Sequence, residues 1–264
     1  MKPWLLQILV PVICLLCGTE ARAEDDLWSD LKMALFPDKV IENGAAFMRM
    51  TAPERAHDAA IVPVQIDFDR AHMQGITLST LTLIVDKNPA PVAAVFRYAS
   101  DRTDPSVGVR IRVNEYTDVH AVAETSDGRL FEIAVFVKAA GGCSAPANKN
   151  PADAEANRGE MKLKRLAAAE REGSLELLIR HPNYSGMQMD QVTRHYIPAD
   201  YVEKIDIRHD GELLLSVEGN ISLSENPAIQ FYLPGQGLDG RVEADVMDSA
   251  GRSFRAEWPV PPAG

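Results

Sequence analysis

The residue best suited to covalent chemistry in this sequence is Cys143, in the stretch FVKAAGGCSAPANKN. A thiolate is a strong nucleophile, so an exposed cysteine can bond covalently to a small molecule or a partner protein. Gly141 and Gly142 precede it, and residues without side chains are free to move and slim enough to enter a narrow pocket. We therefore expect an exposed thiol at Cys143 on a flexible arm formed by Gly141 and Gly142. The alternative, an incidental free cysteine in a loop, stays open at this point.

No other motif in the sequence predicts catalysis. We find no nucleotide-binding glycine loop, no serine nucleophile elbow and no zinc-protease helix. The six histidines are scattered and form no close ligand pair, so surface positions or local hydrogen bonds explain them better than metal binding. Met187 and Met189 could face a soft metal, but methionine more often fills gaps in packing. We expect no catalytic residue, no cofactor and no metal, and hence a protein that is not an enzyme.

The N-terminus predicts export. Lys2 is followed by a mostly apolar run over residues 4–18, and Ala21-Arg22-Ala23 is an A-x-A cleavage site. This order is typical of a secretory signal peptide, which we assign to residues 1–23. The C-x-x-C pair Cys14 and Cys17 falls inside it, so the mature chain keeps Cys143 alone and cannot form an intramolecular disulfide. We expect a periplasmic protein that starts near Glu24.

Charge and hydropathy narrow the choice of partners. The formal net charge is −11, which disfavours binding to nucleic acid and to anionic lipid. After the signal peptide, no segment has the continuous apolar length of a membrane span. The composition therefore favours a protein that meets other proteins, with no nucleic acid and no membrane among its partners.

The sequence pattern predicts that the elements around Cys143 are mainly β-strands. A short helix is expected from Asp26 to Phe36, because leucines recur at helical spacing and Pro37 ends the pattern. Apolar residues then alternate with polar ones in IVPVQIDF, VGVRIRVNEY and LFEIAVFVK. In the second of these, Val109, Ile111 and Val113 share one face and Arg112 falls on the other. Short alternating strands separated by turns predict an antiparallel β-sandwich.

A second sandwich is expected after a linker. Residues 144–156 lack a pattern and contain two prolines, and RGEMKLKRLAAAERE (158–172) suggests a short helical turn. Alternation then returns in SLELLIRHP, YVEKIDIR, ELLLSVEG, IQFYL, GRVEADVMD and RSFRAEWPV. The fold class we predict is all-β, with two sandwiches that associate through apolar faces and a short N-terminal helix.

Several stretches resemble a known pair of families in a fixed order. KAAGGCSAP is similar to the glycine-glycine-cysteine arm of SoxY, the sulfur-carrying subunit of the periplasmic SoxYZ complex, and APERAHDAAIVPVQI resembles the stretch that leads into its sandwich. IRHPNYSGMQMDQVTRHYIPADYVEKIDI, SENPAIQFYL and DVMDSAGRSF resemble SoxZ. The nearest group is the fused SoxYZ-like carrier associated with quinoprotein dehydrogenases.

The resemblance implies immunoglobulin-like antiparallel sandwiches in both halves, paired within the chain. Its domains would be a signal peptide (1–23), a SoxY-like sandwich (24–142), an arm and linker (143–168) and a SoxZ-like sandwich (169–264). Cys143 would be the covalent carrier thiol, and Gly141 and Gly142 would form its arm. The partners would be periplasmic sulfur-oxidation enzymes, or quinoprotein dehydrogenase and cytochrome c proteins.

The chain departs from the SoxY pattern after its cysteine, and two hypotheses on function remain open. The SoxY arm ends soon after its cysteine, whereas here the chain continues through Ser144 into a second domain, so a deep channel would have to admit a doubled chain. The first hypothesis is a carrier of sulfur or similar intermediates on Cys143. The alternative is a non-catalytic accessory or binding protein for a periplasmic PQQ-dependent (quinoprotein) alcohol dehydrogenase, in which the thiol has no role.

Overall fold

The structure is a computed structural model that describes residues 27–73, 75–99, 104–146, 155–166, 173–233 and 239–261. The expected signal peptide, the mature N-terminus and residues 147–154 of the expected linker lie outside these ranges. The described part of the chain contains no helix with the length and apolar character of a membrane span.

One helix and fifteen strands make up the regular structure of the described residues. The N-terminal half contains α1 (Leu27–Leu35), β1 (Ile41–Asn43), β2 (Met48–Thr51), β3 (Val62–Phe68), β4 (Leu78–Val85), β5 (Val92–Tyr98), β6 (Val107–Ile111), β7 (Thr117–Thr125) and β8 (Leu130–Val137). The C-terminal half contains β9 (Met161–Arg165), β10 (Ser174–Ile179), β11 (Val202–His209), β12 (Glu212–Gly219), β13 (Ala228–Tyr232), β14 (Arg241–Asp248) and β15 (Ser253–Pro259). The predicted all-β class with a short N-terminal helix is confirmed.

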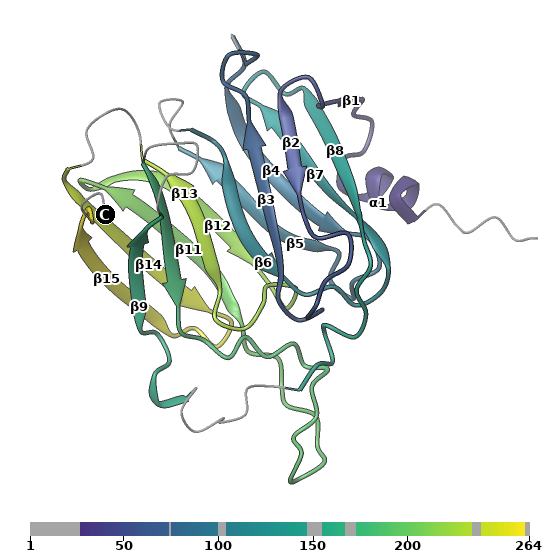
Figure 1. The fold of residues 1–264 in the computed structure, drawn as a ribbon, viewed down its shortest axis with the longest axis vertical. Coiled ribbons are helices and arrows are strands. Elements are labelled where there is room, and N and C mark those ends of the chain that lie inside the picture. The colour runs from purple at the N-terminus through teal and green to yellow at the C-terminus, as the bar shows by residue number, and fades with distance from the viewer. Residues whose placement is uncertain are drawn as a thin grey trace, which may run out of the picture.

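The strands form two sheets that both run through the two halves (Figure 1). The nine-stranded sheet has the order β1-β8-β7-β4-β5-β12-β11-β14-β15, and the six-stranded sheet has the order β2-β3-β6-β13-β10-β9. Each half is thus a two-sheet sandwich. All strand pairs are antiparallel except β1 with β8, which are parallel.

The two sandwiches join edge to edge, not only through apolar faces as the sequence suggested. In the larger sheet β12 pairs with β5, with Val217 opposite Phe96. In the smaller sheet β13 pairs with β6, with Ile229 opposite Val109. Backbone hydrogen bonds across both seams satisfy groups that free edge strands would leave unpaired. One continuous hydrophobic core fills the space between the sheets in both halves.

The apolar alternation read from the sequence places side chains in this core. The alternating residues of β3, β10 and β14 are all buried: Val62, Val64, Ile66, Phe68, Leu175, Leu177, Ile179, Val242, Ala244 and Val246. The expected helical turn within 158–172 is wrong for its first part, because residues 161–165 form β9, an edge strand paired with β10. Its lysines face outward and alternate with half-buried Met161 and Leu163, which is typical of a protected sheet edge.

Helix α1 lies on the outer face of the nine-stranded sheet, near β7 and β8 (Figure 1). Trp28 and Leu31 of α1 and Phe36 just after it pack against a small second cluster of Ile84 and Val122, with Leu130. Of the leucines whose spacing predicted the helix, Leu31 packs on the sheet, whereas Leu27 and Leu35 are exposed.

Candidate functional site

Cys143 lies in a tight turn after β8, which we call the Cys143 turn (residues 141–144). Gly141 N–H donates to the carbonyl of Asn114 at 2.8 Å, and Gly142 N–H donates to that of Val113 at 3.0 Å. The turn closes with a hydrogen bond from Ser144 N–H to the carbonyl of Gly141 at 3.2 Å. These bonds attach the turn to the segment that follows β6.

The two glycines meet two different requirements of this turn. Gly141 has a φ of 79°, a left-handed conformation that side chains disfavour. A Cβ on Gly142 would lie 2.0 Å from the carbonyl oxygen of Ala59 and 2.6 Å from that of Val113. Gly142 therefore permits a close backbone approach. That the pair forms a flexible arm stays a prediction, because in this structure both residues are hydrogen-bonded in the turn.

The thiol is buried, so the prediction of an exposed thiol at Cys143 is wrong for this conformation. Its exposed fraction is 0 %. The physical reason is that the turn is covered from the other half of the chain, by a projecting segment that starts and ends with the paired residues Tyr184 and Asp200. We call this segment the 184–200 hairpin; Met189 and Tyr196 pair within it.

Two buried side chains at the base of the 184–200 hairpin hold the Cys143 turn. The Ser185 hydroxyl donates a hydrogen bond to the carbonyl of Cys143 itself. The Gln188 amide Nε2 donates to the carbonyl of Ala145 at 3.0 Å. Both bonds cross between the halves, so the C-terminal half takes part in holding the turn in place.

Arg112 completes the surroundings of the turn. It is almost fully buried, and its Nη1 and Nη2 donate to the carbonyls of Gly142 and Asn183, both at 3.1 Å. Its Nε has no hydrogen-bond partner, and within the described ranges no carboxylate forms an ion pair with it. The hydrogen bonds of this buried guanidinium therefore go to carbonyl groups and not to a carboxylate.

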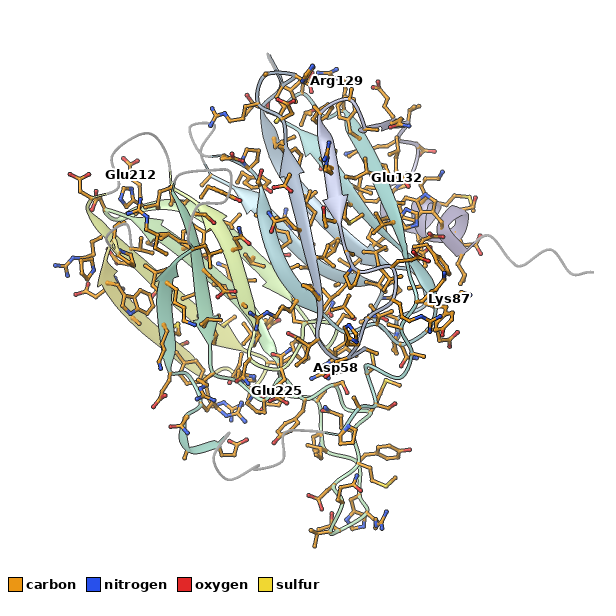
Figure 2. The ribbon with its side chains drawn as sticks, viewed as in Figure 1. Asp58, Lys87, Arg129, Glu132, Glu212 and Glu225 are labelled. Carbon is orange, nitrogen blue, oxygen red and sulfur yellow. The ribbon has the colours of Figure 1, made fainter. Side chains whose placement is uncertain are left out.

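The electrostatics of the turn follow from this burial. Desolvation lowers the pKa of Arg112, and the charges of Cys143, Glu225 and Asp58 oppose that shift only in part. Figure 2 shows Glu225 and Asp58 at the same end of the sandwich, where the two halves meet. Burial raises the pKa of the Cys143 thiol, and Arg112 partly counteracts it. The covered thiol is therefore neutral at pH 7 and a weak nucleophile.

Sequence reasoning found Cys143 but missed the residues around it. Arg112 was expected on the polar face of a strand, but β6 ends at Ile111, and the backbone N–H of Arg112 instead donates to the carbonyl of Ser222 at 2.7 Å. Gln188 lies between Met187 and Met189, which the sequence offered as possible ligands of a soft metal, and of these three residues only Gln188 is buried. Met187 and Met189 are half-buried at its sides.

A group of side chains around His181 has the residue types of a metal site, but arginine side chains already supply its positive charge. His181, Asp200 and Asp248 bring ligand atoms within 4.8 Å of one another. Arg158 lies 2.6 Å from His181 Nε2, and Arg252 contacts both Asp248 and Asp200. These guanidinium groups neutralise the carboxylates, so the group is a structural ion network that anchors the chain before β9.

Comparison with known proteins matches the two halves to two family models. The model of the sulfur oxidation protein SoxY matches residues 32–143, and the model of the sulphur oxidation protein SoxZ matches residues 161–259. The chain is a SoxY–SoxZ fusion. The SoxY match ends at Cys143, which places the buried thiol at the end of the SoxY domain and the Ser185 and Gln188 contacts in the SoxZ domain.

One solved structure among the matches is the sulfur carrier protein SoxY from Chlorobium limicola f thiosulfatophilum. It is 24 % identical to this SoxY–SoxZ fusion over 42 % of the fusion and 90 % of the solved chain, with a TM-score of 0.36. The search of curated proteins found no match.

Proposed function

We propose that this SoxY–SoxZ fusion is a periplasmic covalent carrier of sulfur intermediates, with Cys143 as the carrier thiol, and that it is not itself an enzyme. Membership of both families makes sulfur oxidation the expected process. The observation that carries the proposal is the buried Arg112 guanidinium, which bonds to the carbonyl next to Cys143 and forms no ion pair with a carboxylate in the described part of the chain.

A sulfur adduct on Cys143 would supply Arg112 with an anionic partner. Persulfide and thiosulfonate groups are anions, and burying an anion without a partner costs several kcal/mol. Arg112 offsets this cost for a loaded Cys143, whereas beside the neutral unloaded thiol the guanidinium is compensated only in part, by Glu225 and Asp58. The pocket is thus better matched electrostatically to the loaded form than to the free thiol.

Loading and unloading require partners. Formation of a sulfur–sulfur bond at the thiol removes an electron pair, so a loading partner must pass electrons on, as proteins linked to cytochrome c do. The partner must also reach a thiol that the structure buries, so the Cys143 turn has to leave Arg112, Ser185 and Gln188. Since the chain continues in both directions from Cys143, the turn enters a partner as a doubled loop.

The second candidate is a non-catalytic accessory protein for a periplasmic PQQ-dependent alcohol dehydrogenase. The observation that favours it is the burial of Cys143 together with its raised pKa, since a thiol with a purely structural role has the same properties. In that case the surface of the fusion, and not the thiol, would contact the dehydrogenase.

Intact-mass measurement of the fusion purified from its native periplasm tests the carrier. A carrier shows a mass increase that a reductant removes and that Cys143→Ser abolishes together with growth on the relevant sulfur compound. If the purified protein never carries an adduct and Cys143→Ser grows normally, the carrier proposal fails. Growth on alcohol that depends on the fusion but not on Cys143 would support the accessory function.

A further inference from the structure

Four ionisable residues gather on the outer face of the nine-stranded sheet, in the SoxY half. Asp118 and His120 lie two residues apart on β7, so their side chains share one face of the sheet. His120 lies opposite Ile84 of β4, and Asp86, two residues further along, shares that face at the end of the strand. Glu132 of β8 lies opposite Val122 and so joins them. Figure 2 shows Glu132, and Lys87 next to Asp86, on the side of the molecule that carries α1.

The imidazole of His120 is held in one orientation. Its Nδ1 lies 2.7 Å from Glu132 Oε1, and its Nε2 lies 3.2 Å from Asp86 Oδ2. Trp28 of α1 stacks on the ring, with centroids 3.9 Å apart and an interplanar angle of 12°. A metal-binding histidine usually donates its other ring N–H to a carboxylate, a backbone carbonyl or water, and Glu132 is such a carboxylate.

Asp86 has an oxygen that these contacts do not satisfy. Its side chain is only 8 % exposed, and Oδ1 is buried without any hydrogen-bond partner. A buried carboxylate oxygen without a donor is costly, and a bound cation would remove that cost. Ligand atoms of Asp86, Asp118 and His120 all lie within 4.8 Å of one another, and Asp118 is exposed and gives access from solvent.

The charges around the group remain unbalanced. Asp86, Asp118 and Glu132 are three acids around one imidazole, and in the described part of the chain no lysine or arginine forms an ion pair with any of them. The group around His181 differs in this respect, because Arg158 and Arg252 already supply its positive charge. Only the group under α1 therefore combines metal-ligand residue types with an unfilled requirement for a cation.

We propose that Asp86, Asp118 and His120 bind a divalent transition-metal ion, with Glu132 orienting His120 through its Nδ1. One imidazole and two carboxylates suit Zn²⁺ or Mn²⁺. The ion would coordinate His120 Nε2 in place of the proton that this nitrogen otherwise shares with Asp86. Because Trp28 stacks on His120, a bound ion would also stabilise the attachment of α1 to the sheet.

The competing state of the group is a protonated imidazole without metal. Desolvation lowers the pKa of His120, but the hydrogen bonds and charges of Asp86 and Glu132 outweigh it and raise that pKa to about 9. An imidazolium satisfies Asp86 Oδ2 and Glu132, yet it leaves Asp86 Oδ1 without a donor. The two states differ in whether the protein takes up a metal ion, which can be measured directly.

Titration calorimetry with ZnCl₂, repeated with MnCl₂, tests the site on the mature chain after treatment with EDTA. Cys143→Ser serves as the background, because a thiol can itself bind zinc. We expect one ion per chain, and an affinity lowered by roughly 10–100-fold in Glu132→Gln, the loss typical of an outer-shell partner. Asp118→Asn should lose at least as much, and because Asp118 is exposed the fold should survive the change. His72→Gln is the matched control, since His72 pairs with Asp69 at 2.8 Å on the exposed surface.

Each outcome decides the proposal. Binding of one ion that weakens in Asp118→Asn and Glu132→Gln but not in His72→Gln supports the site. Absence of stoichiometric binding in the Cys143→Ser background overturns it and leaves the imidazolium as the resting state. Binding that all three variants retain unchanged overturns it as well, because the ion then lies elsewhere.

Discussion

Removal of the two side chains of the SoxZ half that hold the Cys143 turn should expose the thiol without unfolding the protein. Ser185 and Gln188 donate to the carbonyls of Cys143 and Ala145, and both belong to the SoxZ half. A hydrogen bond of this kind contributes about 1 kcal/mol, so their joint loss in Ser185→Ala/Gln188→Ala weakens the closed turn by about 2 kcal/mol. Since about 1.4 kcal/mol is a tenfold change in an equilibrium constant, the open population should rise roughly 30-fold.

Alkylation of the native protein measures that population. When opening is fast compared with the chemical step, the rate of modification follows the fraction of molecules in the open state. We expect iodoacetamide, followed by intact mass, to modify the wild-type fusion far more slowly than the denatured chain. The double variant should react roughly 30-fold faster than wild type, with a free energy of unfolding lowered by no more than about 2 kcal/mol.

Gln191→Ala provides the matched control. Gln191 lies in the same 184–200 hairpin but is exposed, and its Nε2 donates only within the hairpin, to the carbonyl of Met189 at 3.1 Å. It should leave the alkylation rate unchanged. The reasoning is refuted if the double variant reacts no faster than wild type, or if Gln191→Ala accelerates the reaction equally. Alkylation of wild type at the rate of the denatured chain would show that the thiol is not buried.

Four further outcomes follow from the contacts of the Cys143 turn and of the seam between the halves. Gly142→Ala should lower the unfolding free energy by more than Gly141→Ala, which should cost about 1–2 kcal/mol for its positive φ, because only the Gly142 Cβ meets backbone atoms; urea unfolding of both variants checks this. Cys143→Ser should cost about 1–3 kcal/mol for burying a hydroxyl in place of a thiol, and a variant as stable as wild type would contradict the burial. Because burial raises the folded-state pKa of Cys143, its contribution to stability is present below the unfolded pKa of about 8.5 and is lost as pH rises towards the folded value, so wild type should lose stability relative to Cys143→Ala in that range. Residues 24–146 and 155–264 produced as separate chains should co-purify, since two sheets cross the seam, and independent elution on size-exclusion chromatography would count against this.

The sequence carried most of the information on the sheets. Residues such as Val62, Val64 and Ile66 alternate because one face of β3 is buried, and that periodicity is local. Strand partners are not local: the pairing of β5 with β12 joins residues more than a hundred positions apart, and no pattern in either strand specifies it. Residues 161–165 were predicted to be helical because Ala, Glu, Lys and Arg favour helices. In the structure the lysines lie on the edge strand β9, where charged side chains protect a sheet edge against aggregation.

Of the candidate site, the sequence predicted Cys143 but not the residues that contact its turn. A single cysteine after two glycines predicts a mobile segment, because the sequence does not show which residues contact it. Two of the side chains that bond to its turn, Ser185 and Gln188, come some forty residues later in the chain. Arg112 was assigned to an outward face by strand alternation, and alternation stops applying where β6 ends at Ile111. The group around His120 is assembled from β4, β7 and β8, so spacing along the sequence could not reveal it.

Fusion of the two domains affects how the buried thiol of Cys143 can be released. The halves share two continuous sheets and one core, so separating them would disrupt both seams at once. The Cys143 turn is held to the SoxZ half by far less, by the hydrogen bonds of Ser185 and Gln188. Local opening therefore costs much less than separation of the domains, and it leaves the core intact. A partner that binds the exposed 184–200 hairpin could move Ser185 and Gln188 together, which would couple its docking to exposure of Cys143 while the sandwich stays closed.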